Sequence, residues 1–155
     1  MTHKKESTKE TVLRLLKNQE LCTLATASEN AVPEAATVRF VCDDDMNVYI
    51  NSGSTYRKYE NMKENPDVAV VVNGDRKNVQ IEGMAEEVFN DEADFVRNKY
   101  KNKYGSSQYL TNDESVFFRI DTSWARLLVD GRYPPEYEMI IGDGDTDPHN
   151  EIAEE

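Results

Sequence analysis

The sequence is poor in the side chains that most often bind metals or act as nucleophiles. Its histidines are His3 and His149, both in polar terminal segments, and its cysteines are Cys22 and Cys42. A zinc centre or a histidine-based catalytic triad needs such residues close together, so we expect neither, and no metal site. Both cysteines lie in predicted strands and outside any CxxC pattern. We expect them to be small buried side chains rather than a redox pair or a disulfide.

Long apolar runs are also absent. No run approaches the about 18 apolar residues that a membrane-spanning helix needs, and the first ten residues are polar, unlike a signal peptide. The sequence therefore predicts a cytoplasmic protein without membrane contact. A formal net charge of −12 also argues against nucleic acid as a partner.

Part of the negative charge is concentrated at the C-terminal end. Residues 143–155 hold six acidic residues and no lysine or arginine, which leaves 18 basic and 24 acidic residues, a net charge of −6, in residues 1–142. We therefore predict one domain over residues 1–142 and an acidic, flexible tail over residues 143–155. The acids from Asp143 to Glu154 have the spacing of a calcium-binding loop. Pro148 stands where that loop needs glycine, so calcium binding is not expected.

Hydrophobic periodicity predicts a mainly β domain with flanking helices. Helices are expected at residues 7–19, 56–65 and 91–104, and the capping residues of the first and last are Ser7 and Asp91. Strands are expected at residues 21–27, 32–42, 47–51, 68–72 and 79–89, with a bulge or a barrel corner at Gly83, followed by a closing hairpin of residues 115–121 and 123–129. Pro134 and Pro135 break the pattern, so no strand is predicted after them.

The stretch from Ala36 to Pro66 concentrates the groups that bind anions. Arg39 alternates with apolar neighbours in a predicted strand, so its guanidinium points away from the buried face. The loop Asn51–Thr55 supplies hydroxyl and amide groups just before a predicted helix. The first turn of that helix carries Arg57 and Lys58, where positive charge opposes the helix dipole. Cations at this end indicate that an anion such as phosphate binds nearby.

Two interpretations of Arg57 and Lys58 remain open at this point. They either bind a phosphate at the helix N-terminus, or they lie on a surface turn and pair with Glu60 or Glu64. Arginine offers a two-pronged donor and lysine a compact charge, which together suit a phosphate dianion.

An ordered set of motifs extends this pattern along most of the chain. After the Arg39 strand come Tyr49-Ile50-Asn51, Tyr56-Arg57-Lys58, Asn65-Pro66-Asp67, Val68–Val72 and Val79-Gln80-Ile81-Glu82-Gly83. Over roughly residues 21–124 this order resembles the pyridoxamine 5′-phosphate oxidase-like family of FMN-binding split barrels. The resemblance implies a six-stranded antiparallel Greek-key split barrel that forms a homodimer and holds FMN at the interface between subunits.

The resemblance also implies roles for individual residues. Arg39 with the Phe40-Val41 backbone would border the flavin and its phosphate, and Ile50, Asn51 and Ser52 would contact the ring or the ribityl chain. Arg57 and Lys58 would bind the phosphate. The implied cofactor-binding set is Arg39, Phe40, Val41, Ile50, Asn51, Ser52, Thr55, Tyr56, Arg57, Lys58, Asn78, Gln80 and Trp124, where Asn78 or Gln80 would meet the flavin edge and Trp124 would come from the partner subunit.

Departures from the family pattern limit the function that the resemblance implies. Cys42 and Asp43 stand where the true oxidase continues to a lysine, the loop before Arg57 is two residues longer, and no set of substrate-phosphate ligands follows. We therefore do not expect pyridoxamine phosphate oxidation. The resemblance instead predicts an FMN-dependent oxidoreductase or reductase with a small-molecule electron donor or acceptor, and it names no catalytic acid or base.

Two alternatives remain open. A deazaflavin coenzyme could replace FMN in the same barrel. The chain could also be a nonenzymatic flavin-, deazaflavin- or haem-binding protein in stress response or sensing, although haem needs an axial ligand and histidine is scarce.

Overall fold

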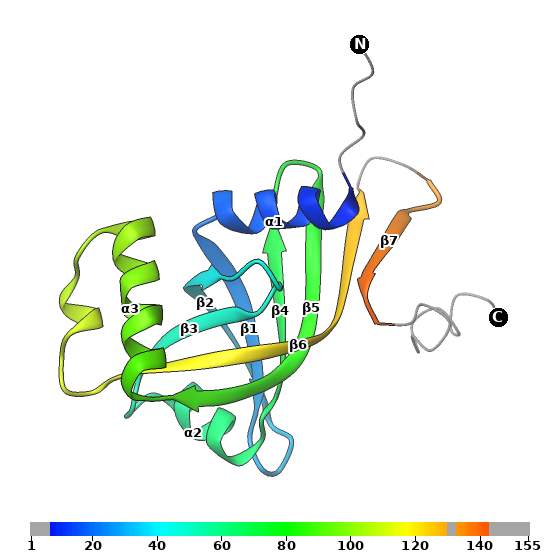
Figure 1. The fold of residues 1–155 in the computed structure, drawn as a ribbon. Coiled ribbons are helices and arrows are strands. Elements are labelled where there is room, and N and C mark those ends of the chain that lie inside the picture. The colour runs from blue at the N-terminus through cyan, green and yellow to red at the C-terminus, as the bar shows by residue number, and fades with distance from the viewer. Residues whose placement is uncertain (1–6, 130–132, 143–155) are drawn as a thin grey trace.

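Six antiparallel strands close into a barrel in the computed structural model, which describes residues 7–129 and 133–142 (Figure 1). The barrel strands are β1 (Leu21–Ala27), β2 (Pro33–Cys42), β3 (Val48–Gly53), β4 (Asp67–Asn73), β5 (Lys77–Val88) and β6 (Ser115–Val129). They follow the order β3-β2-β1-β4-β5-β6, and pairing of β3 with β6 closes the ring. Because β4 lies beside β1 rather than β3, the connection is a Greek key. The predicted fold is confirmed.

The C-terminal part of the sheet differs from the prediction in two ways. The predicted hairpin of residues 115–121 and 123–129 is one continuous strand, β6, which pairs with β5 through residues 117–129. It bends instead of turning, because the register shifts between Glu82 and Gly83: Ser123 is an extra residue in β6, and Gly83 lets the backbone of Asp121 approach closely. A further strand, β7 (Glu136–Ile141), follows Pro135 and pairs with β6 outside the barrel.

Alternating side chains of the strands fill the barrel. In β1, Cys22 and Leu24 face inward and are buried, whereas Thr23 and Ala25 are exposed on the outer face. Cys22 and Cys42 are free, buried thiols, as the sequence predicts. The largest fully buried side chains of this core are Phe40, Phe118, Leu16, Leu24, Met46, Ile50, Met62, Ile81 and Ile120.

Two helices cover opposite ends of the barrel (Figure 1). Helix α1 (Thr8–Asn18) begins as predicted at Ser7, whose hydroxyl accepts a 3.1 Å hydrogen bond from the Glu10 N–H. It buries Val12 and Leu16 completely. Helix α2 (Arg57–Glu64) covers the other end and ends before Pro66, which disfavours helical backbone in the preceding residue.

The third helix, α3 (Asn90–Tyr104), packs against β2, β3 and β6 and forms a second, smaller core. This core contains Val41, Tyr49, Val88, Val96, Tyr100, Leu110 and Phe117. The predicted helix is confirmed, but Asp91 is not its cap. Asp91 lies in the first turn, and Phe89 stands at the cap position without a side-chain hydrogen bond.

Some predictions concern residues outside the described part of the chain. The acidic tail of residues 143–155, with its calcium-loop spacing, and both histidines lie there. Within residues 7–129 and 133–142, no helix has the length and apolar content to cross a membrane.

Candidate functional site

The barrel is split between β2 and β3. These strands pair through three rungs, Phe40 with Ile50, Val41 with Tyr49 and Cys42 with Val48. From Asn51 onward β3 pairs with β6 alone, and from Arg39 backward β2 pairs with β1 alone. The two strands therefore diverge like a fork, and the backbone between them is left open.

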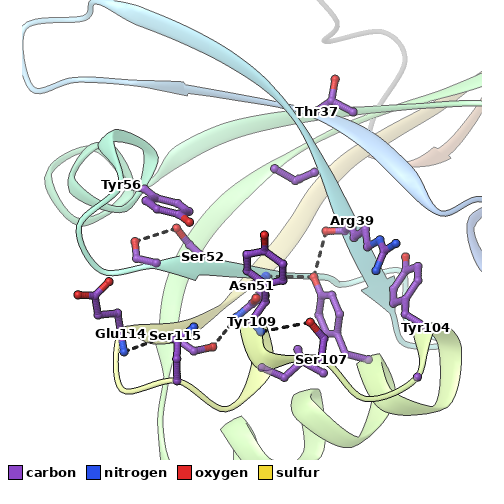
Figure 2. A pocket seen from close by; sticks show the side chains of 16 residues that line it. Thr37, Arg39, Asn51, Ser52, Tyr56, Tyr104, Ser107, Tyr109, Glu114 and Ser115 are labelled. Carbon is purple, nitrogen blue, oxygen red and sulfur yellow. Dashed lines mark hydrogen bonds between the residues drawn. The ribbon is translucent and has the colours of Figure 1, made fainter.

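A pocket of about 450 Å³ lies at this fork (Figure 2). It is lined from β2 by Thr37, Val38 and Arg39, from β3 by Asn51, Ser52 and Gly53, and from the remaining elements by Tyr56, Tyr100, Tyr104, Gly105, Ser107, Tyr109, Leu110, Asn112, Glu114 and Ser115. Four of these residues carry phenol rings. A lining of aromatic rings and hydroxyl groups suits a planar ligand with polar edges.

Arg39 supplies the positive charge of the pocket. Its guanidinium carbon lies 5.0 Å from the centre of the Tyr104 ring (Figure 2). Among the described residues no carboxylate lies within 4.0 Å of it. The Tyr104 hydroxyl is itself fixed, 2.5 Å from the Phe40 carbonyl oxygen and 2.9 Å from that of Glu20. Burial raises the pKa of Tyr104 to about 12, so the phenol is neutral at physiological pH.

The β3 side of the pocket offers polar groups held by short hydrogen bonds. The Asn51 side-chain amide donates to the Ser115 hydroxyl at 2.8 Å and to the Val116 carbonyl at 3.1 Å. Ser52 is buried, and the Tyr56 ring lies so close to Gly53 that a Cβ there would be 3.1 Å from it. These contacts fix the lining before any ligand arrives.

Four residues predicted from the sequence, Arg39, Asn51, Ser52 and Tyr56, line this pocket together. Phe40 and Ile50 are the sequence neighbours of the pocket-lining residues Arg39 and Asn51, but their own side chains are fully buried in the barrel core. The side chain of Val41 packs in the smaller core under α3.

The predicted phosphate ligands lie at the start of α2, outside the set that lines the pocket. Arg57 pairs with Glu34 of β2, at 2.8 Å from Nε to Oε2, rather than with Glu60 or Glu64. The Lys58 ammonium lies 4.5 Å from the centre of the Tyr56 ring, and burial lowers its pKa. Lys58 therefore reaches a residue of the pocket wall. Thr55 lies in the loop between β3 and α2.

The remaining predicted residues lie on the outer face of the sheet, away from the fork. Gln80 accepts a 2.7 Å hydrogen bond from Arg126, whose guanidinium lies 5.2 Å from the Trp124 ring and 4.0 Å from the Tyr137 ring. Asn78 is two residues from Gln80 in β5. Within one copy of the chain these residues do not line the pocket.

The sequence prediction missed Tyr100, Tyr104 and Tyr109. Tyr100 and Tyr104 are one turn apart on α3, a spacing from which helical periodicity alone predicts only a shared face. The rings of both residues pack in the smaller core. Their hydroxyls reach the backbone of β2, 61 and 64 positions away in the sequence. No local pattern carries that information.

A second hollow of about 290 Å³ lies on the other side of α3. It is lined by Lys17, Val41, Cys42, Lys99, Asn102 and Lys103. Lys99 donates to the Cys42 carbonyl at 3.1 Å, and Lys103 donates to the Leu16 and Phe40 carbonyls at 3.2 and 3.3 Å. These lysines tie α3 to β2 and α1, and burial lowers the pKa of Lys103.

Comparison with known proteins identifies the family. A sequence model of the family described as pyridoxamine 5′-phosphate oxidase matches residues 8–128, more than half of the chain. The chain belongs to the pyridoxamine 5′-phosphate oxidase family. No curated protein matches the sequence.

Solved structures with the same fold differ in what they are named for. A haem-binding protein from Mycobacterium smegmatis has a TM-score of 0.74 at 15% identity, over 88% of this chain and 60% of that one. General Stress Protein 26 from Bacillus anthracis has a TM-score of 0.65 at 19% identity, over 85% of this chain and 98% of that one. An F420 reductase has a TM-score of 0.61 at 21% identity, over 72% of this chain and 93% of that one. At these identities the likeness shows the fold of the family and not the ligand.

Proposed function

We propose that this family member is an FMN-binding flavoprotein, a homodimeric oxidoreductase or flavin-dependent reductase that holds FMN at the fork between β2 and β3. The observation that carries the proposal is the pocket at the fork, where Arg39 has no carboxylate partner among the described residues and lies beside phenol rings and amide groups. A flavin has a flat ring with polar edges and a charged phosphate, which matches each of these groups.

The phosphate of the cofactor would bind towards the start of α2. The first N–H groups of this helix have no side-chain cap, and Lys58 lies against the pocket-lining Tyr56. Arg57 is already held beside this point by Glu34, and a phosphate dianion would compete with that carboxylate for the guanidinium.

A second copy of the chain would complete the site. Apart from Arg39, the outer face of β1 and β2 carries short or apolar exposed side chains: Leu21, Thr23 and Ala25 lie opposite Arg39, Thr37 and Ala35. A face of short side chains allows two sheets to pack closely. The same face continues to Gln80 and Trp124, which explains how residues far from the fork in one copy could reach the cofactor of the other.

The bound flavin would supply the hydride or electron chemistry. The residues of this chain would orient it: Arg39 balances negative charge, Asn51 and Ser52 hold the β3 side rigid, and the phenol rings of α3 keep water from one side of the pocket. No side chain of the pocket is assigned as an acid or base.

An absorption spectrum of the purified protein, before and after addition of FMN, tests this proposal. We expect the flavin bands and tight retention of FMN. Arg39→Ala, and separately Arg57→Ala combined with Lys58→Ala, should each weaken FMN binding by at least about tenfold, because a charge-assisted hydrogen bond contributes about 1.5–3 kcal/mol. Lys63→Ala, on the same helix as Arg57 but paired with Glu87, is the matched control and should bind normally. A wild-type protein that binds no FMN would refute the proposal.

Two further measurements separate the alternatives. If the protein binds a deazaflavin more tightly than FMN, the proposed cofactor changes to a deazaflavin, whereas the proposed binding site stays the same. Oxidation of a reduced nicotinamide by the FMN-loaded protein distinguishes an oxidoreductase from a nonenzymatic flavin carrier. Haem is disfavoured by the described residues, which contain no histidine to ligate the iron.

A further inference from the structure

The β2–β3 pairing ends one hydrogen bond earlier than its alternating pattern would lead us to expect. In an antiparallel pair, every second pair of opposite residues exchanges backbone hydrogen bonds. Asp43 N–H donates to the Asn47 carbonyl at 3.1 Å, and the paired register then continues through Val41 with Tyr49. Two residues further along this series, Arg39 stands opposite Asn51. An Asn51 N–H to Arg39 carbonyl bond is therefore expected there.

A side-chain hydroxyl occupies the place of that bond. The Asn51 N–H donates to the Tyr100 hydroxyl oxygen at 3.0 Å. The same hydroxyl lies 3.0 Å from the Arg39 carbonyl oxygen and 3.1 Å from that of Tyr49. The backbone donor and acceptor that would form the next rung are thus bridged by an inserted oxygen atom, and β2 and β3 separate from this point.

Packing holds the inserted hydroxyl in position. Tyr100 is 4% exposed, and its ring lies 6.1 Å from that of Phe117 and 5.6 Å from that of Tyr104, centre to centre. It extends from the 15-residue helix α3, which buries Val96 in the same small core. Burial raises the pKa of Tyr100, so the hydroxyl keeps its proton. A neutral hydroxyl can both accept from an N–H and donate to a carbonyl, which neither lysine nor a carboxylate can do.

We propose that Tyr100 is a positioning residue whose hydroxyl keeps β2 and β3 apart at Arg39 and Asn51 and thereby keeps the pocket open for a planar, ring-bearing ligand. The ligand class rests on the proposed function, whereas the separation of the strands rests on the hydrogen bonds alone. Without the inserted oxygen, the strands can approach to the usual spacing of about 4.8 Å and form the missing rung. Closure would bring together the two walls of the pocket that carry Arg39 and Asn51.

Tyr100→Phe tests the proposal because it removes one oxygen atom and keeps the ring. In the wild type, NMR should show the Tyr100 hydroxyl proton close to the Asn51 amide proton and no contact between the Arg39 and Asn51 amide protons. In Tyr100→Phe the Arg39 to Asn51 amide contact should appear, with the Asn51 amide still protected from exchange. The affinity for FMN should fall by at least about tenfold.

Tyr49→Phe is the matched control. It also removes a partly buried phenol hydroxyl, bonded to Asp43 at 3.1 Å, but its side chain lies outside the pocket. Tyr49→Phe should lower the free energy of unfolding. It should neither create the contact between the Arg39 and Asn51 amide protons nor weaken the binding of FMN. This control separates loss of a hydrogen bond from closure of the fork.

Each outcome has a defined meaning. The new amide contact together with weaker FMN binding supports the proposal. A Tyr100→Phe protein whose strands stay apart, or one that closes the rung and still binds FMN normally, overturns it. If that variant does not fold, the wild-type contact between the Tyr100 hydroxyl and the Asn51 amide decides alone, and its absence overturns the proposal. A wild type that binds no FMN refutes the proposed function, while the amide contacts still test the strand separation.

Discussion

On each of two sides of α3, two side chains one turn apart form hydrogen bonds to backbone carbonyls of β2, but the two sides face different hollows. On one side Tyr100 and Tyr104, one turn apart, reach the carbonyls of β2, and on the other side Lys99 and Lys103, also one turn apart, do the same. The tyrosine side faces the pocket at the fork, and the lysine side faces the smaller hollow. Neutral donors hold the backbone without adding charge. Among the described residues that line the pocket, Arg39 is therefore the only lysine or arginine.

This comparison teaches how one helix can be anchored and still leave a selective pocket. If lysines replaced the tyrosines, a ligand would meet several mobile cations and its orientation would be poorly defined. Because phenols do the anchoring, the position of Arg39 fixes where negative charge is favoured. Four variants or conditions would break or sharpen the difference between the sides.

The largest effect is expected on the lysine side. Lys103→Met removes the ammonium that donates to the Leu16 and Phe40 carbonyls, and it should lower the free energy of unfolding by about 2 kcal/mol. Part of the loss is offset because the buried charge is itself unfavourable. Urea unfolding measures the change, and FMN affinity should stay the same. Lys101→Met, on the same helix but in neither hollow, is the control; equal stability of the two variants would contradict the assignment.

A smaller effect is expected on the tyrosine side. Tyr104→Phe removes the hydroxyl next to the Phe40 and Glu20 carbonyls but keeps the ring beside Arg39, so it should cost about 1 kcal/mol. FMN affinity should change by less than about threefold, because the cation and ring contact remains. Urea unfolding and FMN titration provide both values. A loss of FMN binding as large as that of Arg39→Ala would show that the hydroxyl contributes as much to ligand binding as the guanidinium does.

Alkaline pH should reveal the same hydroxyl. Burial raises the pKa of Tyr104 from 10.0 in the unfolded chain to about 12 in the folded protein, so the unfolded state releases this proton first. Its stabilising contribution is complete below pH 10 and is lost as the pH rises to about 12. Unfolding measured across this window should therefore show a shallower loss of stability in Tyr104→Phe than in the wild type. Identical slopes would place the hydroxyl in water.

The smallest effect is expected at the rim of the lysine hollow. Lys17 pairs with Asp44 at 2.6 Å, and both side chains are largely exposed. Water and salt screen such a pair, so Lys17→Gln should leave the melting temperature unchanged. A clear loss, abolished by high salt, would show that the hollow depends on its exposed charges as well as on its buried ones.

The sequence predicts the parts of this molecule that depend on local pattern. Alternation and turn residues locate the barrel strands, Ser7 marks the start of α1, and Gly83 marks the bulge. The continuous strand β6 was missed because polar residues around Asp121 resemble a turn, whereas the chain there forms a bulge at Ser123, opposite Gly83 of β5. Strand β7 was missed because a proline pair precedes it, yet an edge strand requires only one paired side.

The candidate site is predictable to the same extent. Arg39, Asn51 and Ser52, which belong to the predicted set, line one pocket. The partner of Arg57 was not predictable, because Glu34 is 23 positions away and is brought close only by closure of the barrel. The hydroxyls of α3 raise the same difficulty: periodicity assigns a tyrosine to a buried face, but not the carbonyl that its oxygen reaches.

The place of β6 in the chain has a consequence for biosynthesis. This strand pairs with β5 through residues 117–129 and with β3 through residues 115–120. Until the ribosome has released it, the nascent polypeptide carries two open strand edges, which are the surfaces on which chains aggregate. Closure of the barrel must therefore wait until β6 has left the ribosome, and chaperones that shield strand edges are expected to influence the yield of this protein more than those that act on its helices.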